Sequence, residues 1–180
     1  GGTENSAIGN YSMDAHTSGD QNTAVGMNAM GGNTSGGNNT AVGRASLFVN
    51  STGSDNTAVG RNALNQNTTA TDNTAVGSSA LDANTTGADN VAVGRSAAPA
   101  QTTANHNVAV GSRALYSNVT AIDNVAVGYK SLYTLNDASG GDDAFGNTAV
   151  GHQSGMDLTT GNSNTMTGYS AAQQITTGTG

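Results

Sequence analysis

Four aspartates of this sequence recur at a regular spacing that could bring their carboxylates together to bind a metal ion. Asp55, Asp72, Asp89 and Asp123 each stand directly before an Asn, separated by 17 residues or by twice that number. If the chain brings them together, they form a ladder of carboxylate and amide oxygens, the ligand type that calcium prefers. Each repeat supplies one carboxylate, however, whereas calcium takes about six to eight oxygens. We therefore expect these aspartates to cap turns through their own backbone, and we expect no metal site and no cofactor.

Catalytic groups find little support in the sequence. His16, His106 and His152 occupy three different positions of the repeat described below, so they do not form a ladder, and we expect each to be a lone surface side chain. Asp142 and Asp143 are adjacent, which in a strand would point them to opposite faces. No Gly-x-Ser-x-Gly motif accompanies a suitable His and Asp. The sequence therefore predicts a protein that is not an enzyme.

The elements that position these residues are set by a repeat that covers the whole chain. Its motif is Asn-Thr-Ala-Val-Gly or Asn-Val-Ala-Val-Gly, with degenerate copies at both ends, and residues 1–180 form one repetitive segment. Successive copies are 17 residues apart, except for one interval of 23. Self-similarity at a fixed short period is typical of solenoids. The ten units begin at Asn5, Asn22, Asn39, Asn56, Asn73, Asn90, Asn107, Asn124, Asn147 and Asn164.

Each unit predicts a short strand, a second short extended segment and a turn. In the unit that begins at Asn56 these are residues 57–59, 61–64 and 65–72, and Gly60 marks a position that we expect to exclude a Cβ atom. Seventeen residues cannot bury a core alone, but parallel coils stacked about 4.8 Å apart can. The predicted fold is all-β, a parallel β-solenoid or β-roll of ten coils without helices.

The residue type at each position of the repeat predicts which side chains point into the coil and which point outward. The fourth residue is Val or Ile in every unit except the last, which has Thr167, and we expect this β-branched stripe to point into the coil. The third residue is Ala until Met166, and by alternation it points outward. A uniformly small outer stripe favours close packing of identical chains, so we expect two further copies, as a homotrimer held through residues such as Ala92 and Ala109. The repeated Asn predicts a ladder of stacked amides.

Composition excludes several classes of protein. The chain is 34% hydrophobic and 9% charged, with 26 glycines and no cysteine, against about 45–50% and about 25% for ordinary soluble domains. A net charge of −7 with only five Lys and Arg residues argues against binding of nucleic acid. No apolar run approaches the roughly 20 residues of a membrane span, and the missing cysteine excludes disulfides.

The repeat resembles a known class of fibre. The units NTAVGRNALNQNTTATD, from Asn56, and NTAVGSSALDANTTGAD, from Asn73, resemble the 17-residue arrays of long bacteriophage tail fibres. They are also similar to the head repeats of trimeric autotransporter adhesins. The resemblance implies an extracellular, homotrimeric shaft on a virion that supports attachment to a host cell. It further implies contact with a host glycan or receptor through flanking domains.

The long unit that begins at Asn124 contains six extra residues, and solenoid insertions map to loops. Loops on rigid scaffolds often bind ligands, so this one is a candidate surface contact, although a tolerated insertion is favoured. Its candidate residues are Gly140, Gly141, Asp142, Asp143 and Phe145.

Several alternatives stay open. A bacterial trimeric adhesin head would bind a surface directly. An ice-binding solenoid would present a flat Thr array, and here the Thr row gives way to Val in three central units. A polysaccharide-degrading spike would need a carboxylate pair in a groove. Arg44, Arg61 and Arg95 share one position of the repeat and form either a solvated ladder or a contact for an anionic glycan.

Overall fold

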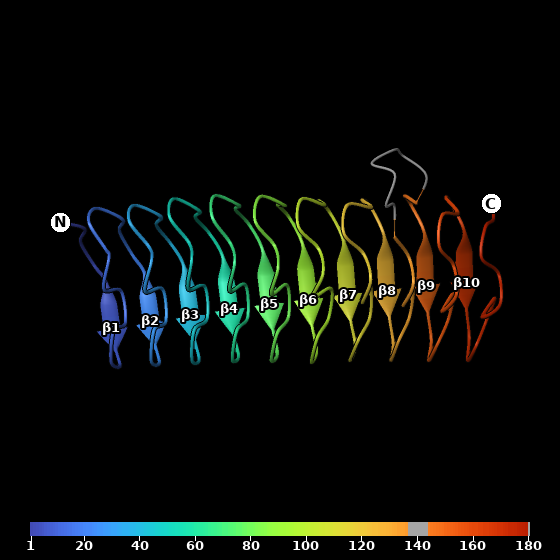
Figure 1. The fold of residues 1–180 in the computed structure, drawn as a ribbon, viewed down its shortest axis with the longest axis horizontal. Coiled ribbons are helices and arrows are strands. Elements are labelled where there is room, and N and C mark those ends of the chain that lie inside the picture. Colours follow the sequence, from blue (N-terminus) through green and yellow to red (C-terminus); the bar gives the residue numbers. More distant parts are fainter. Residues whose placement is uncertain (137–143, 180) are drawn as a thin grey trace.

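The chain winds into a parallel β-solenoid with one short strand in each turn (Figure 1). The computed structural model describes residues 1–136 and 144–179. Ten strands form a single sheet in chain order, so that each strand pairs with the strands of the preceding and following coils. The strands are β1 Ser6–Ile8, β2 Thr23–Val25, β3 Thr40–Val42, β4 Thr57–Val59, β5 Thr74–Val76, β6 Val91–Val93, β7 Val108–Val110, β8 Val125–Val127, β9 Thr148–Val150 and β10 Thr165–Thr167.

The register of the sheet follows the sequence repeat. Ala58 of β4 pairs with Ala75 of β5, and the same alignment holds along the sheet. It also holds across the long unit, where Val125 pairs with Thr148. Each coil is joined to the next by backbone bonds such as Thr57 N to Asn73 O at 2.8 Å. The predicted solenoid register is therefore confirmed, including the resumption of the motif after the insertion.

The faces of the strand are the reverse of those predicted from the sequence. The middle Ala of the strand points inward and is fully buried, as at Ala58 and Ala92, whereas the flanking Thr and Val side chains face out. The physical reason is the thinness of the coil: opposite walls are so close that the strand can turn only a methyl group inward. The Ala stripe is thus part of the chain's own core and supplies no evidence for a contact between chains.

The predicted second extended segment is a turn. Asn62 and Leu64 have φ values of 58° and 49°, in the left-handed region, and the equivalent residues of other coils share these values. The turn begins at Gly60, whose φ is 135° and where an added Cβ would lie 2.6 Å from the backbone of Gly77. The prediction that this Gly position excludes a Cβ is confirmed on both grounds. A left-handed Leu costs about 1–2 kcal/mol, which the burial of its side chain offsets.

The buried Leu column fills the middle of the solenoid. Leu47, Leu64 and Leu81 are fully buried and stack one above another in successive coils. The ninth coil has Gly155 in this position, and the tenth has Met166 where other coils have a strand Ala. An added Cβ at Gly155 would lie 2.8 Å from Cε of Met166, so the long Met side chain occupies the space that a Leu would fill. The loss of a Leu side chain at Gly155 is thus compensated by the gain of a Met side chain at position 166, which keeps the total volume of the core.

The repeated Asn that opens each coil forms the amide ladder that the sequence predicted. Nδ2 of Asn56 donates to Oδ1 of Asn39 at 3.1 Å, and the backbone N–H of Asn56 donates to the same oxygen at 3.0 Å. Nδ2 also donates to the carbonyl oxygen of Ala70 in its own coil at 2.9 Å, which closes the coil. Each buried Asn therefore links neighbouring coils and fixes the turn within one coil.

A second amide column runs beside the first, but it changes along the chain. In Asn50, Asn67 and Asn84, Nδ2 donates to Oδ1 of the Asn in the preceding coil, at distances of 2.8 to 3.2 Å. Gln101 follows them, and its longer side chain reaches past the ladder, so that Oδ1 of Asn84 is buried without a partner. Further along, Leu135 occupies the same position. This column therefore tolerates apolar side chains.

The break at Gln101 leads to a prediction. Changing Gln101→Asn should give Oδ1 of Asn84 the donor that it lacks, because an Asn in this position donates to the preceding Asn elsewhere in the column. An unsatisfied buried acceptor costs about 1–3 kcal/mol, so we expect the midpoint of urea unfolding to rise. The matched control is Asn67→Gln, which should strand Oδ1 of Asn50 and lower the midpoint. If Gln101→Asn is instead destabilising, the bonds from Gln101 to its own coil outweigh the ladder.

The insertion is confined by the residues on either side of it. The backbone N–H of Asn136 donates to Thr159 O at 3.1 Å, as its position in the repeat requires. Coil geometry resumes at Ala144, which is buried and whose carbonyl oxygen accepts Nδ2 of Asn124 at 2.9 Å. The extra residues therefore fall within 137–143. Phe145, which the sequence analysis assigned to the loop, belongs to the coil, where its carbonyl oxygen accepts the N–H of Ser163.

Removing six residues from this unit should preserve the solenoid. Deleting residues 140–145 restores a 17-residue coil, and Ala138 then takes the place of the buried Ala144. Because shortening a loop lowers its closure entropy only modestly, we expect an unchanged or slightly higher melting temperature. Deleting residues 139–145 removes one residue more, leaves a coil too short for the register, and should lower the melting temperature. Equal effects of the two deletions would contradict the proposed register.

Candidate functional site

One surface that repeats in every coil is the outward side of the sheet, here called the outer strand surface. It consists of the two side chains that flank the buried Ala of each strand, and it is unbroken from β1 to β10. Ile8 is 66% exposed and Val42 is 37% exposed. One row contains Ser6, Thr23, Thr40, Thr57, Thr74, Val91, Val108, Val125, Thr148 and Thr165. The other contains Ile8, Val25, Val42, Val59, Val76, Val93, Val110, Val127, Val150 and Thr167.

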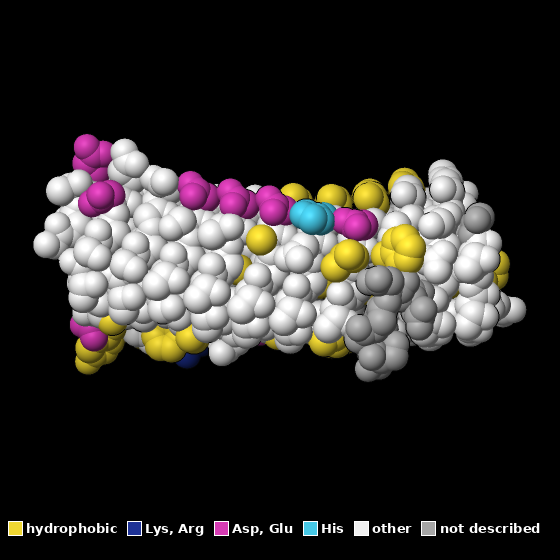
Figure 2. Space-filling model, turned by 90° about the horizontal axis from the view of Figure 1, so that it is seen from above, with side chains coloured by type: hydrophobic (Ala, Val, Ile, Leu, Met, Phe, Trp, Pro, Cys, Tyr) yellow, Lys and Arg dark blue, Asp and Glu magenta, His cyan; other side chains and the backbone are white. Residues whose placement is uncertain are grey.

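The aspartates that precede the strands form the acidic column, which consists of Asp55, Asp72, Asp89 and Asp123 (Figure 2). All four have positive φ, near 57° to 60°. Other coils place Gln21, Asn38 and Ser163 here with the same conformation. Asn and Asp tolerate the left-handed region better than most residues, so backbone geometry explains why this position favours them. This agrees with the expected role of the aspartates in the turn.

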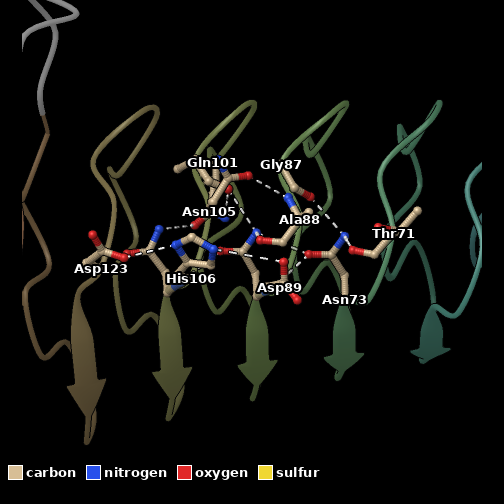
Figure 3. Close-up of polar contacts among 12 residues, drawn as sticks. Thr71, Asn73, Gly87, Ala88, Asp89, Gln101, Asn105, His106 and Asp123 are labelled. Carbon is tan, nitrogen blue, oxygen red and sulfur yellow. Dashed lines mark hydrogen bonds and ion pairs between the residues drawn. The ribbon is translucent and has the colours of Figure 1, made fainter.

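His106 fills the one gap in the acidic column (Figure 3). Its Nδ1 lies 3.0 Å from Oδ1 of Asp123, and its Nε2 lies 3.9 Å from Oδ2 of Asp89. The three side chains come from successive coils and are largely exposed. The imidazole therefore lies between two carboxylates that are two coils apart and contacts both of them.

No group of three or more His, Asp or Glu side chains that could hold a metal ion occurs within residues 1–136 and 144–179. The acidic column provides one carboxylate per coil, and His106 replaces a carboxylate in the sixth coil. What the column supplies is a line of negative charge along one border of the outer strand surface.

A flank on the other side of the strand carries stacked aromatic rings that the sequence analysis missed. Tyr129, His152 and Tyr169 lie one above another, with ring centroids 5.2 and 5.0 Å apart. Tyr116 and Tyr133 form a second stack at 5.0 Å. The available signal was the repeat itself, because the first three residues share one position of the coil and the last two share another. Each ring stacks on the ring of the neighbouring coil, which stabilises the solenoid. Tyr116, Tyr129 and Tyr169 are also exposed to solvent.

Lys130 joins the two aromatic stacks. Its Nζ lies 5.6 Å from the ring centroid of Tyr129 and 5.0 Å from that of Tyr133, within the range of cation–π contacts. Arg44, Arg61 and Arg95 are exposed, as the sequence analysis expected of a solvated ladder. None of these three arginines lies within 4.0 Å of a carboxylate in the part of the chain that the structure describes.

The three histidines do occupy three separate columns, as predicted, but none is a lone surface side chain. His16 lies in the second amide column, where Nε2 is 2.8 Å from Gly19 O and Nδ1 is 3.3 Å from Nδ2 of Asn33. The other two belong to the acidic column and to an aromatic stack. Each histidine replaces the usual residue of its column and keeps that column's contacts with neighbouring coils.

Two carboxyl groups of the described residues have shifted pKa values, and neither lies in the acidic column. Hydrogen bonds from the backbone and side chain of Thr3 lower the pKa of Asp20. Partial burial raises the pKa of Asp82, against the opposing effects of a hydrogen bond from Ser79 and the charge of Arg61.

Most of the candidate contact loop lies outside the residues that the structure describes. Gly140, Gly141, Asp142 and Asp143 lie outside the described residues. Phe145 is a partly exposed residue of the coil. The structure thus brings none of the described residues of this group into a site.

Comparison with protein-family models, with curated proteins and with solved structures finds no match to this chain. No helix that is long and apolar enough to cross a membrane occurs among the residues that the structure describes. The functional argument therefore depends on the solenoid and its surfaces.

Proposed function

We propose that this chain is a structural shaft section of a homotrimeric extracellular fibre, of the bacteriophage tail-fibre type, that supports attachment to a host cell. The observation that carries the proposal is the outer strand surface, a straight strip of Thr and Val side chains that crosses all ten coils without interruption. Exposed apolar strips of this kind mark contact sites between proteins. The role is mechanical and assigns no catalytic step to any residue.

The dimensions of the solenoid support a shaft. Ten coils at about 4.8 Å give a section roughly 45 Å long. Backbone bonds run from coil to coil along its whole length, such as Val91 N to Asn107 O at 2.9 Å, and the buried Asn ladder runs parallel to them. The load of a fibre pulled along its axis is thus shared by many hydrogen bonds in every coil.

The partner that we assign to the outer strand surface is the same surface of two further copies. All copies carry the same strip, so a copy related by rotation about the fibre axis presents the same residues at each level. The three-residue strands cover a strip of roughly 450 Å², about half of the approximately 800 Å² per partner that a specific interface buries. The columns that border the strip must therefore also take part.

The direct test is the mass of the chain in solution. We expect light scattering to give three times the chain mass of 17.7 kDa, together with a β-type circular dichroism spectrum. A folded chain with the mass of one copy at micromolar concentration would contradict the proposal. An antibody against the chain should label thin fibres in electron micrographs of the particles that carry it. Label on bacterial cell-surface fibres would instead favour the adhesin alternative.

A second function, ice binding, is favoured by one specific observation. Thr and Val face out together from a regular sheet, and the intervening Ala, which the sequence analysis placed on the outer face, is buried. The hydroxyl row is interrupted by Val91, Val108 and Val125, which makes this function the weaker of the two. It requires the strip to be free, so a monomer that inhibits ice recrystallisation would support it, and a trimer without such activity would exclude it.

A further inference from the structure

The two borders of the outer strand surface carry opposite charges. The acidic column precedes the strands, two residues before each strand begins. All five basic residues of the chain follow the strands, two or three residues after each strand ends, and they are called here the basic border. They are Arg44, Arg61, Arg95, Arg113 and Lys130. No carboxylate occurs in these two positions of the coil in any unit, and no Lys or Arg occurs in the position of the acidic column.

Few charges of the two borders are paired within the described part of the chain, although the charge of Arg61 acts on the partly buried Asp82. The acidic column places Asp55, Asp72 and Asp89 in consecutive coils, about 4.8 Å apart, where like charges repel one another. Ion pairs within 4.0 Å among the described residues join only His106 to Asp89 and Asp123. Arg44, Arg61 and Arg95 are exposed and Arg113 is partly buried, and no described carboxylate lies within 4.0 Å of any of them. Each border thus carries a line of charge that a partner chain can complement.

We infer that copies of this chain associate in parallel and in register, with the acidic column of one copy against the basic border of the next. This inference rests on the proposed self-association through the outer strand surface. It adds the orientation of the copies and the residues that select it.

The orientation follows from symmetry. Rotation about the fibre axis keeps all strands running in the same sense around the assembly, so the end of one strand approaches the beginning of the next and unlike borders meet. A twofold axis perpendicular to the fibre reverses one chain along the axis and places like borders together. Charge repulsion therefore disfavours the antiparallel arrangement, and charge attraction favours the parallel one.

The axial positions of the charges select the register. Apart from Glu4, which stands in the same position before the first coil, the acidic column extends from the end of the third coil to the end of the seventh, and the basic border extends from the third coil to the eighth. The first two coils contain no Lys or Arg, and neither do the last two. Copies at the same height bring the two charged stretches fully into contact, whereas axial displacement by several coils places part of each against uncharged residues.

Cross-linking tests the orientation, and the absence of native cysteine makes the experiment clean. Two variants, Asp72→Cys and Arg61→Cys, are prepared separately, mixed by unfolding and refolding together, and treated with a short bifunctional thiol reagent. The expected product joins residue 72 of one chain to residue 61 of another. Products that join 72 to 72 and 61 to 61 in preference would overturn the inference, because they require like borders to meet.

Charge variants test the energetic role. Changing Arg44, Arg61 and Arg95 together to Gln should weaken association about tenfold or more at low ionic strength, and much less at high salt. The matched control changes Thr52, Thr69 and Thr86 to Glu, which alters net charge equally at exposed positions away from both borders. Exchanging the charges on both borders, with Asp55, Asp72 and Asp89 changed to Arg and the three arginines to Asp, should restore association.

The outcomes separate this inference from the proposed function. A chain that remains a monomer under all conditions removes the proposed function and the inference together. A trimer that is equally weakened by the Arg and Thr variants, or that cross-links like borders, retains the proposed function and overturns the charge-selected orientation.

Discussion

Replacing Ala92 with Glu is expected to unfold the coils around β6, whatever the state of assembly. Ala92 is fully buried in the middle of the strand, and it faces the wall of its own coil. A carboxylate there has no room and no partner among the described residues, and burial of an unpaired charge accounts for losses of stability above about 4 kcal/mol. Loss of the β-type circular dichroism spectrum at 25 °C, or a steep fall in the urea midpoint, would register the effect.

The neighbouring change Val93→Glu provides the control. Val93 is next in the strand but faces out, so a Glu there can reach water in a single chain. We expect the coil to keep its spectrum while the trimer dissociates. If Ala92→Glu left the fold intact and only dissociated the assembly, the strand faces would be as the sequence analysis first predicted, and the observed burial would be contradicted.

The inversion of the strand faces shows what the sequence could not decide. Strict alternation established that Ala58 and its two neighbours point to opposite sides, but it did not say which side is the core. The usual preference of β-branched residues for the interior favoured Val59 inward. That preference assumes an interior wide enough for Val, and the width of a 17-residue coil depends on turns whose conformation the sequence did not reveal.

The turns escaped prediction because their backbone is unusual. Leu64 is a good strand or helix residue by propensity, and nothing in its type indicates a φ of 49°. In the structure the side chains of this column are buried in the core. By contrast, Gly60 stands at a position whose residue type does signal an unusual backbone, and there the prediction is confirmed. Asp72 also has a residue type that tolerates positive φ, but its predicted capping of the turn stays a prediction.

Columns of the repeat were the reliable guide to surfaces. Once coils stack in register, any two residues 17 apart are neighbours, so the acidic column and the aromatic stacks could both be derived by aligning the units. The contacts of His106 with Asp89 and Asp123 follow from that alignment. What alignment could not supply is the side of the coil that each column faces, which decides whether a column stabilises the core or meets a partner.

The change Asn73→Leu is expected to destabilise the solenoid by about 2 kcal/mol or more. Nδ2 of Asn73 donates to Asn56, to Thr71 O and to Gly87 O at 2.9 to 3.2 Å. Its Oδ1 is the acceptor for the backbone N–H of Asn90 at 3.0 Å. Leucine removes all of these bonds and leaves a buried N–H without an acceptor. Urea unfolding measures the loss, and hydrogen exchange at the amide of Asn90 should accelerate.

The change Asn84→Leu is the matched comparison, since both residues are fully buried Asn side chains in the same coil. Asn84 donates to Oδ1 of Asn67 at 3.2 Å and to Gly87 O at 2.9 Å, but its own Oδ1 has no partner. Gly87 O would keep the bond from Asn73, and Leu135 and Leu158 already fill this position in later coils. Asn84→Leu removes two bonds and strands Oδ1 of Asn67, whereas Asn73→Leu removes five, including those that its Oδ1 accepts from the N–H and Nδ2 of Asn90. We therefore expect the cost of Asn84→Leu to be smaller by about 1 kcal/mol or more. Equal costs would mean that the two amide columns hold the coil in the same way, and that the exclusive use of Asn in the first column has a cause other than the N–H that it satisfies in the next coil.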